Sequence, residues 1–165
     1  YGSRIGLAIE QRTVAVLVTG QITAQGEDIF RRVLVHRRVG LGTDNDDSIG
    51  RVAYHYHKQA QERGYIVTIL FFWLNVPTLA IERVRLRVQS GGHNVSEEKI
   101  LRRYDMGIKH LFNLYLPICD YWIIIDNSNT PMIISEGGKD ITTKIHHKTL
   151  FNQLINYERT RITGA

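Results

Sequence analysis

The chain has 165 residues, of which 43% are hydrophobic and 22% are charged. This length supports one compact domain with a buried core, and the longest apolar run falls short of the ~20 residues of a spanning helix, which excludes a membrane protein. The formal charge is 21 − 16 = +5, which favours anionic ligands such as nucleotides, nucleic acid or anionic lipid. Cys119 is the only cysteine, so no internal disulfide can form and a cytoplasmic location is expected.

The first 47 residues carry few structural signals. Val14 to Gly20 predicts a strand or a helix followed by an ordinary turn. Residues 30–44 are rich in arginine, but their only aromatic rings are those of Phe30 and His36. A solvated strand or loop is therefore favoured over a nucleic-acid surface. The arginines concerned are Arg31, Arg32, Arg37 and Arg38.

A helix and a strand are predicted next. Residues 46–63 have helical apolar spacing, an acidic cap at their start and a stop at Gly64. Tyr65 to Leu74 is a continuous apolar and β-branched run, which predicts a strand buried on both faces of a parallel sheet. His55 and His57 lie two residues apart on the predicted helix and point in different directions, so no metal site is expected there.

Two basic helices joined by glycines follow this strand. The first spans Thr78 to Gln89, ends at Gly91-Gly92, and places Arg83 and Arg87 four residues apart on one face. The second begins at Ser96, with acidic residues in its first turn. It is amphipathic, and its cations are Lys99, Arg102, Arg103 and Lys109.

These arginines have two interpretations. Any one of them alone is typical of a solvated helix face. Four arginines on two helices around a Gly-Gly hinge predict a mobile flap that closes over phosphates, because guanidinium groups offer planar, bidentate and permanently charged donors.

The last third of the chain predicts a strand, a hairpin and a helix. Tyr121 to Ile125 is a second buried strand, and it ends at Asp126-Asn127-Ser128, the kind of strand end where open α/β sheets bind ligands. The same three residues suit an Asx-type turn toward Pro131. Residues 132–145 predict a short hairpin around Gly-Gly, and residues 147–161 predict a final helix. The adjacent His146 and His147 lack a nearby cluster of acids or thiols, so no metal site is expected there either.

Several of these motifs occur together at linked spacing. They are Trp73-Leu-Asn-Val-Pro-Thr-Leu-Ala-Ile-Glu-Arg83-Val-Arg-Leu-Arg87-Val, Gly91-Gly-His-Asn94, Ile100-Leu-Arg-Arg-Tyr104, Asn113-Leu-Tyr-Leu-Pro-Ile-Cys-Asp120 and Asp126-Asn-Ser128. From about residue 51 to about residue 131, this series resembles the C-terminal half of the zeta-toxin-like P-loop kinases, and more narrowly the bacterial group often labelled predicted ABC-type ATPase.

The resemblance implies a single three-layer α/β domain over residues 1–165, of the P-loop kinase type, with a parallel sheet and a helical lid. It implies ATP and Mg²⁺ as cofactors, and transfer of the γ-phosphoryl group to a hydroxyl of a small molecule such as a nucleotide sugar. It also implies an antitoxin protein as a partner class. Carried over by position, it assigns Asn127 toward the nucleotide base and a phosphate-binding lid made of Arg83, Arg87, His93, Arg102 and Arg103.

Two elements of such kinases are missing from this sequence. The loop G-x-x-x-x-G-K-[ST] does not occur. In its nearest imitation the glycines, Gly20 and Gly26, are one residue too far apart, and Glu27 and Asp28 stand where the lysine and hydroxyl should be. The substrate-site Glu-Thr-Thr signature is also absent between Gly26 and residue 47. Either the substrate segment has been replaced, or the chain is a fragment with a truncated or frame-disturbed N-terminal part.

Both explanations predict little or no turnover, and no catalytic residue is assigned. The alternative function is that of a non-catalytic remnant whose basic helices bind a partner protein or an anionic polymer. Neither a membrane nor a dedicated nucleic-acid partner is expected.

Overall fold

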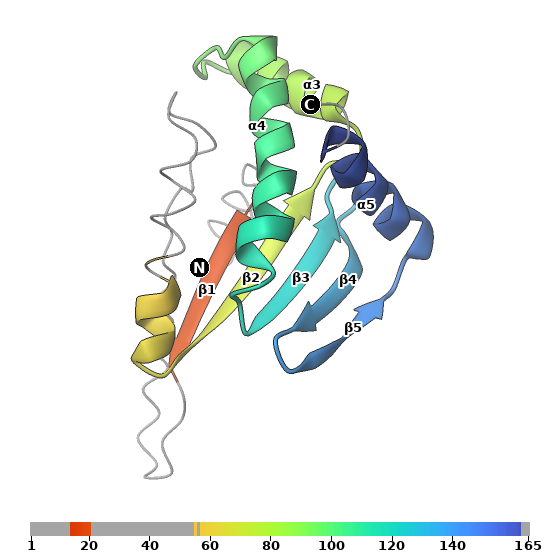
Figure 1. The fold of residues 1–165 in the computed structure, drawn as a ribbon. Coiled ribbons are helices and arrows are strands. Elements are labelled where there is room, and N and C mark those ends of the chain that lie inside the picture. The colour runs from red at the N-terminus through yellow and green to blue at the C-terminus, as the bar shows by residue number, and fades with distance from the viewer. Residues whose placement is uncertain (1–13, 21–54, 56, 163–165) are drawn as a thin grey trace.

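A computed structural model describes residues 14–20, 55 and 57–162 (Figure 1). In these ranges five strands form one sheet in the order β1-β2-β3-β4-β5, accompanied by helices, so the architecture is α/β as predicted. The strands are β1 (Val14–Gly20), β2 (Tyr65–Trp73), β3 (Tyr121–Asp126), β4 (Met132–Gly138) and β5 (Ile141–Ile145). The helices are α3 (Pro77–Gln89), α4 (Glu97–His110) with a π-helical turn at Leu111–Tyr115, and α5 (Lys148–Ile162). None of these helices is long and apolar enough to cross a membrane.

The sheet is mixed, whereas the sequence pattern predicts a parallel one. β2 and β3 are parallel because α3 and α4 form a long crossover between them. β4 and β5 follow β3 through short connections, which return the chain in the opposite direction, so these pairs are antiparallel. β1 is also antiparallel to β2. The expected parallel sheet is therefore wrong outside the β2/β3 pair in this part of the chain.

The core lies between one face of the sheet and the helices α4 and α5 (Figure 1). Alternate residues of β3 are buried, as for a strand with one face turned toward these helices. β2 also alternates in its first half, where Ile66 is 39% exposed, and is buried throughout only from Phe71 to Trp73. The prediction of a strand buried on both faces holds only at the carboxyl end of β2. The core cluster contains Val67, Ile69, Phe71, Trp73, Ile108, Leu111, Tyr115, Cys119, Trp122, Ile124, Ile134 and Leu154.

The segment before β2 ends as predicted. Residues 57–62 are helical, and Gly64 terminates the segment with a φ of +78°, in the left-handed region that favours glycine. The predicted start of this helix, at residues 46–48, lies outside the described residues. His55 is exposed and His57 is buried, so the two side chains point in different directions, as expected from their spacing.

The hairpin of β4 and β5 is confirmed, but its glycines lie in β4, and residues 139–140 form the turn. A Cβ atom on Gly137 would lie 2.6 Å from the ring of Trp122. A Cβ atom on Gly138 would lie 2.1 Å from the carbonyl oxygen of Asp120. Close packing, rather than turn geometry, requires these two glycines.

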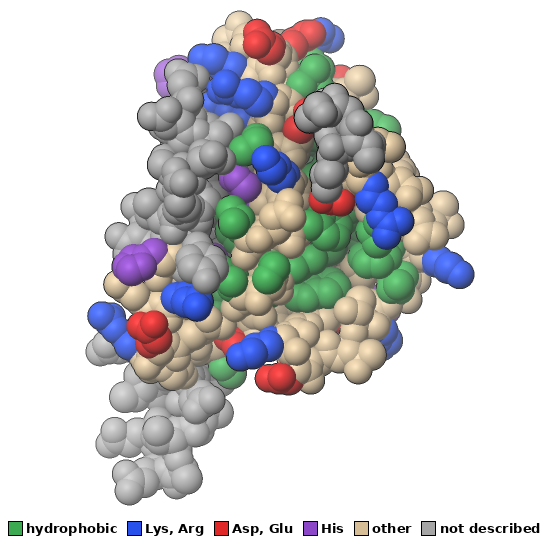
Figure 2. Space-filling model, viewed as in Figure 1, with side chains coloured by type: hydrophobic (Ala, Val, Ile, Leu, Met, Phe, Trp, Pro, Cys, Tyr) green, Lys and Arg blue, Asp and Glu red, His purple; other side chains and the backbone are tan. Residues whose placement is uncertain are grey.

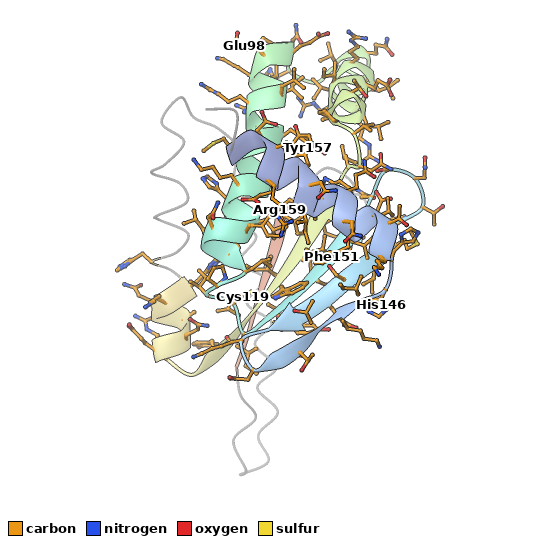
Figure 3. The ribbon with its side chains drawn as sticks, turned by 45° about the vertical axis from the view of Figure 1, so that its right-hand side comes forward. Glu98, Cys119, His146, Phe151, Tyr157 and Arg159 are labelled. Carbon is orange, nitrogen blue, oxygen red and sulfur yellow. The ribbon has the colours of Figure 1, made fainter. Side chains whose placement is uncertain are left out.

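The predicted final helix is α5, and its apolar residues pack against the core. Leu154 is fully buried, and Leu150, Phe151 and Tyr157 pack against the core. Figure 3 shows Phe151 over the sheet and Tyr157 near α4. α5 therefore packs against both β4 and α4.

Candidate functional site

The carboxyl ends of β2 and β3 form the candidate site, because these two strands are parallel and end side by side. Trp73 at the end of β2 is the register partner of Asp126 at the end of β3. The chain enters a loop after each strand, and polar residues occupy both loops. Open α/β sheets bind ligands at such strand ends.

The loop after β3 is an Asx-type turn, which confirms one of the two predicted interpretations of these residues. The Oδ1 atom of Asp126 accepts hydrogen bonds from the main-chain N–H of Ser128 at 3.0 Å and from its hydroxyl at 2.5 Å. The Ser128 hydroxyl oxygen accepts a hydrogen bond from the N–H of Asn75 at 2.8 Å. The N–H of Asn127 donates to the carbonyl of Trp73 at 2.7 Å. These contacts join the loops after β2 and β3, and the residues of the turn, Asp126 to Ser128, are buried.

Arg83 reaches this turn from α3. Pro77 occupies the first turn of α3, directly after the β2 loop, where its fixed φ suits a helix start. The guanidinium of Arg83 donates hydrogen bonds to the carbonyl of Asn127 and, at 3.4 Å, to that of Ser128. Arg83 thus lies at the strand ends, as a ligand-binding role requires. Asn127 is 7% exposed, and both its main-chain N–H and its carbonyl are hydrogen-bonded. Its role toward a nucleotide base stays a prediction.

Gly91-Gly92, the predicted hinge, ends α3 with the geometry of a Schellman motif. Gly91 has a φ of +87°, its N–H donates to the carbonyl of Val88, and the N–H of Gly92 donates to the carbonyl of Arg87 at 2.9 Å. The side chain of Arg87 donates to the carbonyl of His93 at 3.1 Å. Arg87 and His93 are therefore brought together at the hinge, while Arg83 lies at the strand ends.

The two remaining predicted arginines lie on α4, which packs against α3. Arg102 is exposed and Arg103 is half-buried. Figure 2 shows Lys and Arg side chains gathered near the upper end of α4. α4 is therefore basic, as predicted, whereas the contacts of Arg83 and Arg87 form two further, separate groups.

An ion pair that the sequence did not indicate spans the hinge. The guanidinium of Arg85 lies 2.5 Å from the carboxylate of Glu97, and both side chains are well exposed. Glu97 was expected only to favour the start of α4. The only available sequence signal was the opposite charge of the two residues, and it could not identify which arginine pairs. Beneath this ion pair is a recess of about 320 Å³, lined by Ile81, Val84, Arg85, Asn94, Val95, Ser96, Glu97 and Ile100.

Tyr104 fixes α4 to the strand ends. Its hydroxyl accepts a hydrogen bond from the indole N–H of Trp73 at 3.0 Å and donates to the carbonyl of Leu74. Burial raises the pKa of the Tyr104 hydroxyl well above its ordinary value, so the phenol stays neutral. The Tyr157 hydroxyl of α5 donates to Asp105 at 2.6 Å. The carboxyl half of α4 is thus anchored, whereas α3 has no fully buried residue.

The described residues contain no group of three or more His, Cys, Asp or Glu residues placed to hold a metal ion. At the strand ends, Asp126 already accepts two hydrogen bonds from Ser128 through one oxygen. No Mg²⁺ ligand is therefore assigned. Arginines, by contrast, approach the strand ends and the hinge from α3.

No family model matches this chain, and no curated protein or solved structure matches it.

Proposed function

We propose that this chain is the lid-bearing part of an ATP-binding phosphotransferase, which transfers the γ-phosphoryl group of ATP to a hydroxyl of a small molecule. The observation that carries the proposal is the position of Arg83, whose guanidinium lies against the ends of two parallel strands. The sequence resemblance to zeta-toxin-like kinases supports the same function and suggests a nucleotide sugar as the acceptor class.

The chemistry assigned to the flap is charge stabilisation. A guanidinium has five N–H donors, and Arg83 directs its two contacts with main-chain carbonyls through one terminal nitrogen. The other donors of this guanidinium can bind phosphate oxygens without loss of the contact with the loop after β3. Arg87, with His93 at the hinge, and Arg102 and Arg103 on α4 lie in separate groups in this structure, and we assign them to the same phosphates when the flap closes. Fixed donors of this kind stabilise the charge that builds up as a phosphoryl group is transferred.

Titration of the full chain with MgATP by calorimetry tests this function. The double variant Arg102→Ala/Arg103→Ala should weaken ATP binding by at least about tenfold, because charge-assisted hydrogen bonds contribute about 1.5–3 kcal/mol each. The control is Lys139→Ala/Lys148→Ala, which removes the same charge from two exposed positions outside the flap. Absence of ATP binding to the unaltered chain, or equal weakening by both double variants, would falsify the proposal.

The rival function, binding of an anionic polymer, predicts a different result from the same variants. Binding of a nucleic-acid strand would weaken steeply with salt, and loss of two phosphate contacts would reduce the slope of log K against log salt by about 0.7–0.9 per contact. Turnover is a separate question. Hydrolysis by this chain should be far slower than by a version preceded by an intact phosphate loop, and equal rates would refute the expected impairment.

A further inference from the structure

A buried histidine lies at the opposite end of the sheet from the proposed site. The helical residues 57–62, here called the docking segment, lie beside the start of β2, whereas α3 lies at the strand ends (Figure 1). His57 in this segment is 6% exposed. Its ring lies 6.1 Å from that of Tyr115, which is itself 1% exposed. His57 is thus enclosed against the π-helical turn after α4.

The surroundings of His57 suit only its neutral form. Its Nδ1 atom is buried and has no hydrogen-bond partner among the described residues, and neither has the hydroxyl of Tyr115. His110, at the end of α4, faces the same Tyr115 ring at 6.4 Å. Burial lowers the pKa of the His57 imidazole below 6.5.

Both carboxylate oxygens of Asp120, five residues after Tyr115, already accept hydrogen bonds. Gln61 of the docking segment donates hydrogen bonds to the carbonyl of Ile118 at 2.7 Å and to Oδ1 of Asp120 at 3.0 Å. The other oxygen of Asp120 accepts the N–H of Val67 at 2.8 Å. The charged side chains of the segment itself, Lys58 and Glu62, are exposed. An imidazolium at position 57 would therefore have a charge without a dedicated counter-ion in the described structure.

We infer that the docking segment is a pH-sensitive element, held in place by neutral His57 and released when His57 binds a proton. Release would break the contacts of Gln61 and uncover the start of β2. The strand ends with Arg83 and Asp126 would keep their structure, because Tyr104 and α5 fix them independently. This inference does not depend on the proposed function.

The direction of the pH effect follows from linkage. The neutral form is favoured in the docked state, so the docked state binds fewer protons than the released state, and docking is strongest above the unfolded pKa of 6.5. Docking weakens as pH falls below that value. At pH 5.5 the released population should increase by up to about tenfold relative to pH 7.5.

Hydrogen exchange of the full chain tests the inference. It is measured by mass spectrometry at pH 7.5 and 5.5, with labelling times corrected for intrinsic exchange rates. Peptides covering residues 57–64 should lose protection at pH 5.5, while peptides of β3 and α5 keep theirs. His57→Phe retains a ring without a basic nitrogen and should hold protection equal at both pH values. If phenylalanine packs poorly at position 57, His57→Gln replaces it as the test variant and should show the same pH-independent protection.

His55→Gln is the matched control, since His55 is exposed in the same segment and hydrogen-bonds Gln59. It should respond to pH as the unaltered chain does. The inference is overturned if the segment of the unaltered chain shows no pH response, if His57→Phe responds equally, or if all peptides lose protection together.

Discussion

The guanidinium of Arg83 on α3 donates hydrogen bonds to the main-chain carbonyl of Asn127, the residue that directly follows β3. Because α3 has no fully buried residue, this contact is a main attachment of the helix to the sheet. It also brings a cation to the carboxyl ends of two parallel strands. One side chain thus links the stability of α3 to the site proposed for phosphates.

Replacement of Arg83 by Met should therefore loosen α3. Methionine keeps much of the apolar stem but removes every donor, and loss of a half-buried, charge-assisted contact should cost about 1–2 kcal/mol in urea unfolding. Hydrogen exchange should increase most in residues 77–89. Arg85→Met is the control, because the exposed Arg85–Glu97 pair contributes at most about 1 kcal/mol. Equal losses in the two variants would contradict the anchoring role of Arg83.

The two helices of the flap could be predicted from local signals in the sequence. Pro77 begins the first helix and Gly91 ends it, because proline has the φ of a helix start and glycine tolerates the positive φ of the helix end. Ser96 is the N-cap residue of the second helix, as predicted, but its side chain makes no capping hydrogen bond. The end of β3 at Asp126 was also predictable from local signals, because an Asx-type turn follows the apolar run. The placement of Arg83 near these strand ends was not derivable from spacing. The family resemblance assigns Arg83 only to a phosphate-binding lid, and that role stays a prediction.

The features that the sequence did not reveal depend on contacts between distant residues. The acceptors of Arg83 are main-chain carbonyls, which every residue has, so no side-chain pattern marks them. Strand direction likewise depends on the length of the connection, and the short β3–β4 link makes that pair antiparallel. Gly137 and Gly138 suggested a turn, but they are required by Trp122 and by the carbonyl of Asp120.

Two buried serines should respond oppositely to alanine. The hydroxyl of Ser128 accepts from Asn75 and donates to Asp126, so Ser128→Ala leaves a buried N–H and a carboxylate without these partners. It should cost about 1–3 kcal/mol of unfolding free energy. The hydroxyl of Ser135 is buried without a partner in the described structure, so Ser135→Ala should be neutral or stabilising. Urea denaturation of both variants measures these changes in the free energy of unfolding. A larger loss of stability for Ser135→Ala than for Ser128→Ala would show that the hydrogen-bond assignment is wrong.

A methyl group at Gly138 should be more disruptive than one at Gly64. The new Cβ at position 138 meets a main-chain oxygen of Asp120 at 2.1 Å, so the β3 and β4 backbones must separate. We expect Gly138→Ala to cost about 3 kcal/mol and to lower the thermal midpoint accordingly. Gly64→Ala meets no atom within 4 Å and carries only the strain of a φ of +78°, about 1–2 kcal/mol. The reverse order of the two melting temperatures would argue against the close packing of β4 on Asp120.

Cys119 should make the fold sensitive to alkaline pH. Burial raises the pKa of its thiol from 9.0 to about 12, and that of the Tyr115 hydroxyl from 10.0 to about 12. Both groups bind protons more tightly in the folded state than in the unfolded state, so their contribution to stability is fully present below pH 9 and is lost as pH rises toward 12.

At pH 10 the loss attributable to Cys119 should be about 1 kcal/mol relative to pH 7.5. Cys119→Ala should therefore show a shallower decline of its urea midpoint between these two pH values, whatever its stability at pH 7.5, and addition of Tyr115→Phe should flatten the curve further above pH 10. The same burial predicts that Ellman's reagent reacts with Cys119 at pH 8 only as fast as the chain opens, and immediately in urea. Two results together would contradict the burial of Cys119 between the π-helical turn and β3. The thiol would react at once in the folded chain, and the urea midpoint of Cys119→Ala would decline with pH as steeply as that of the unaltered chain.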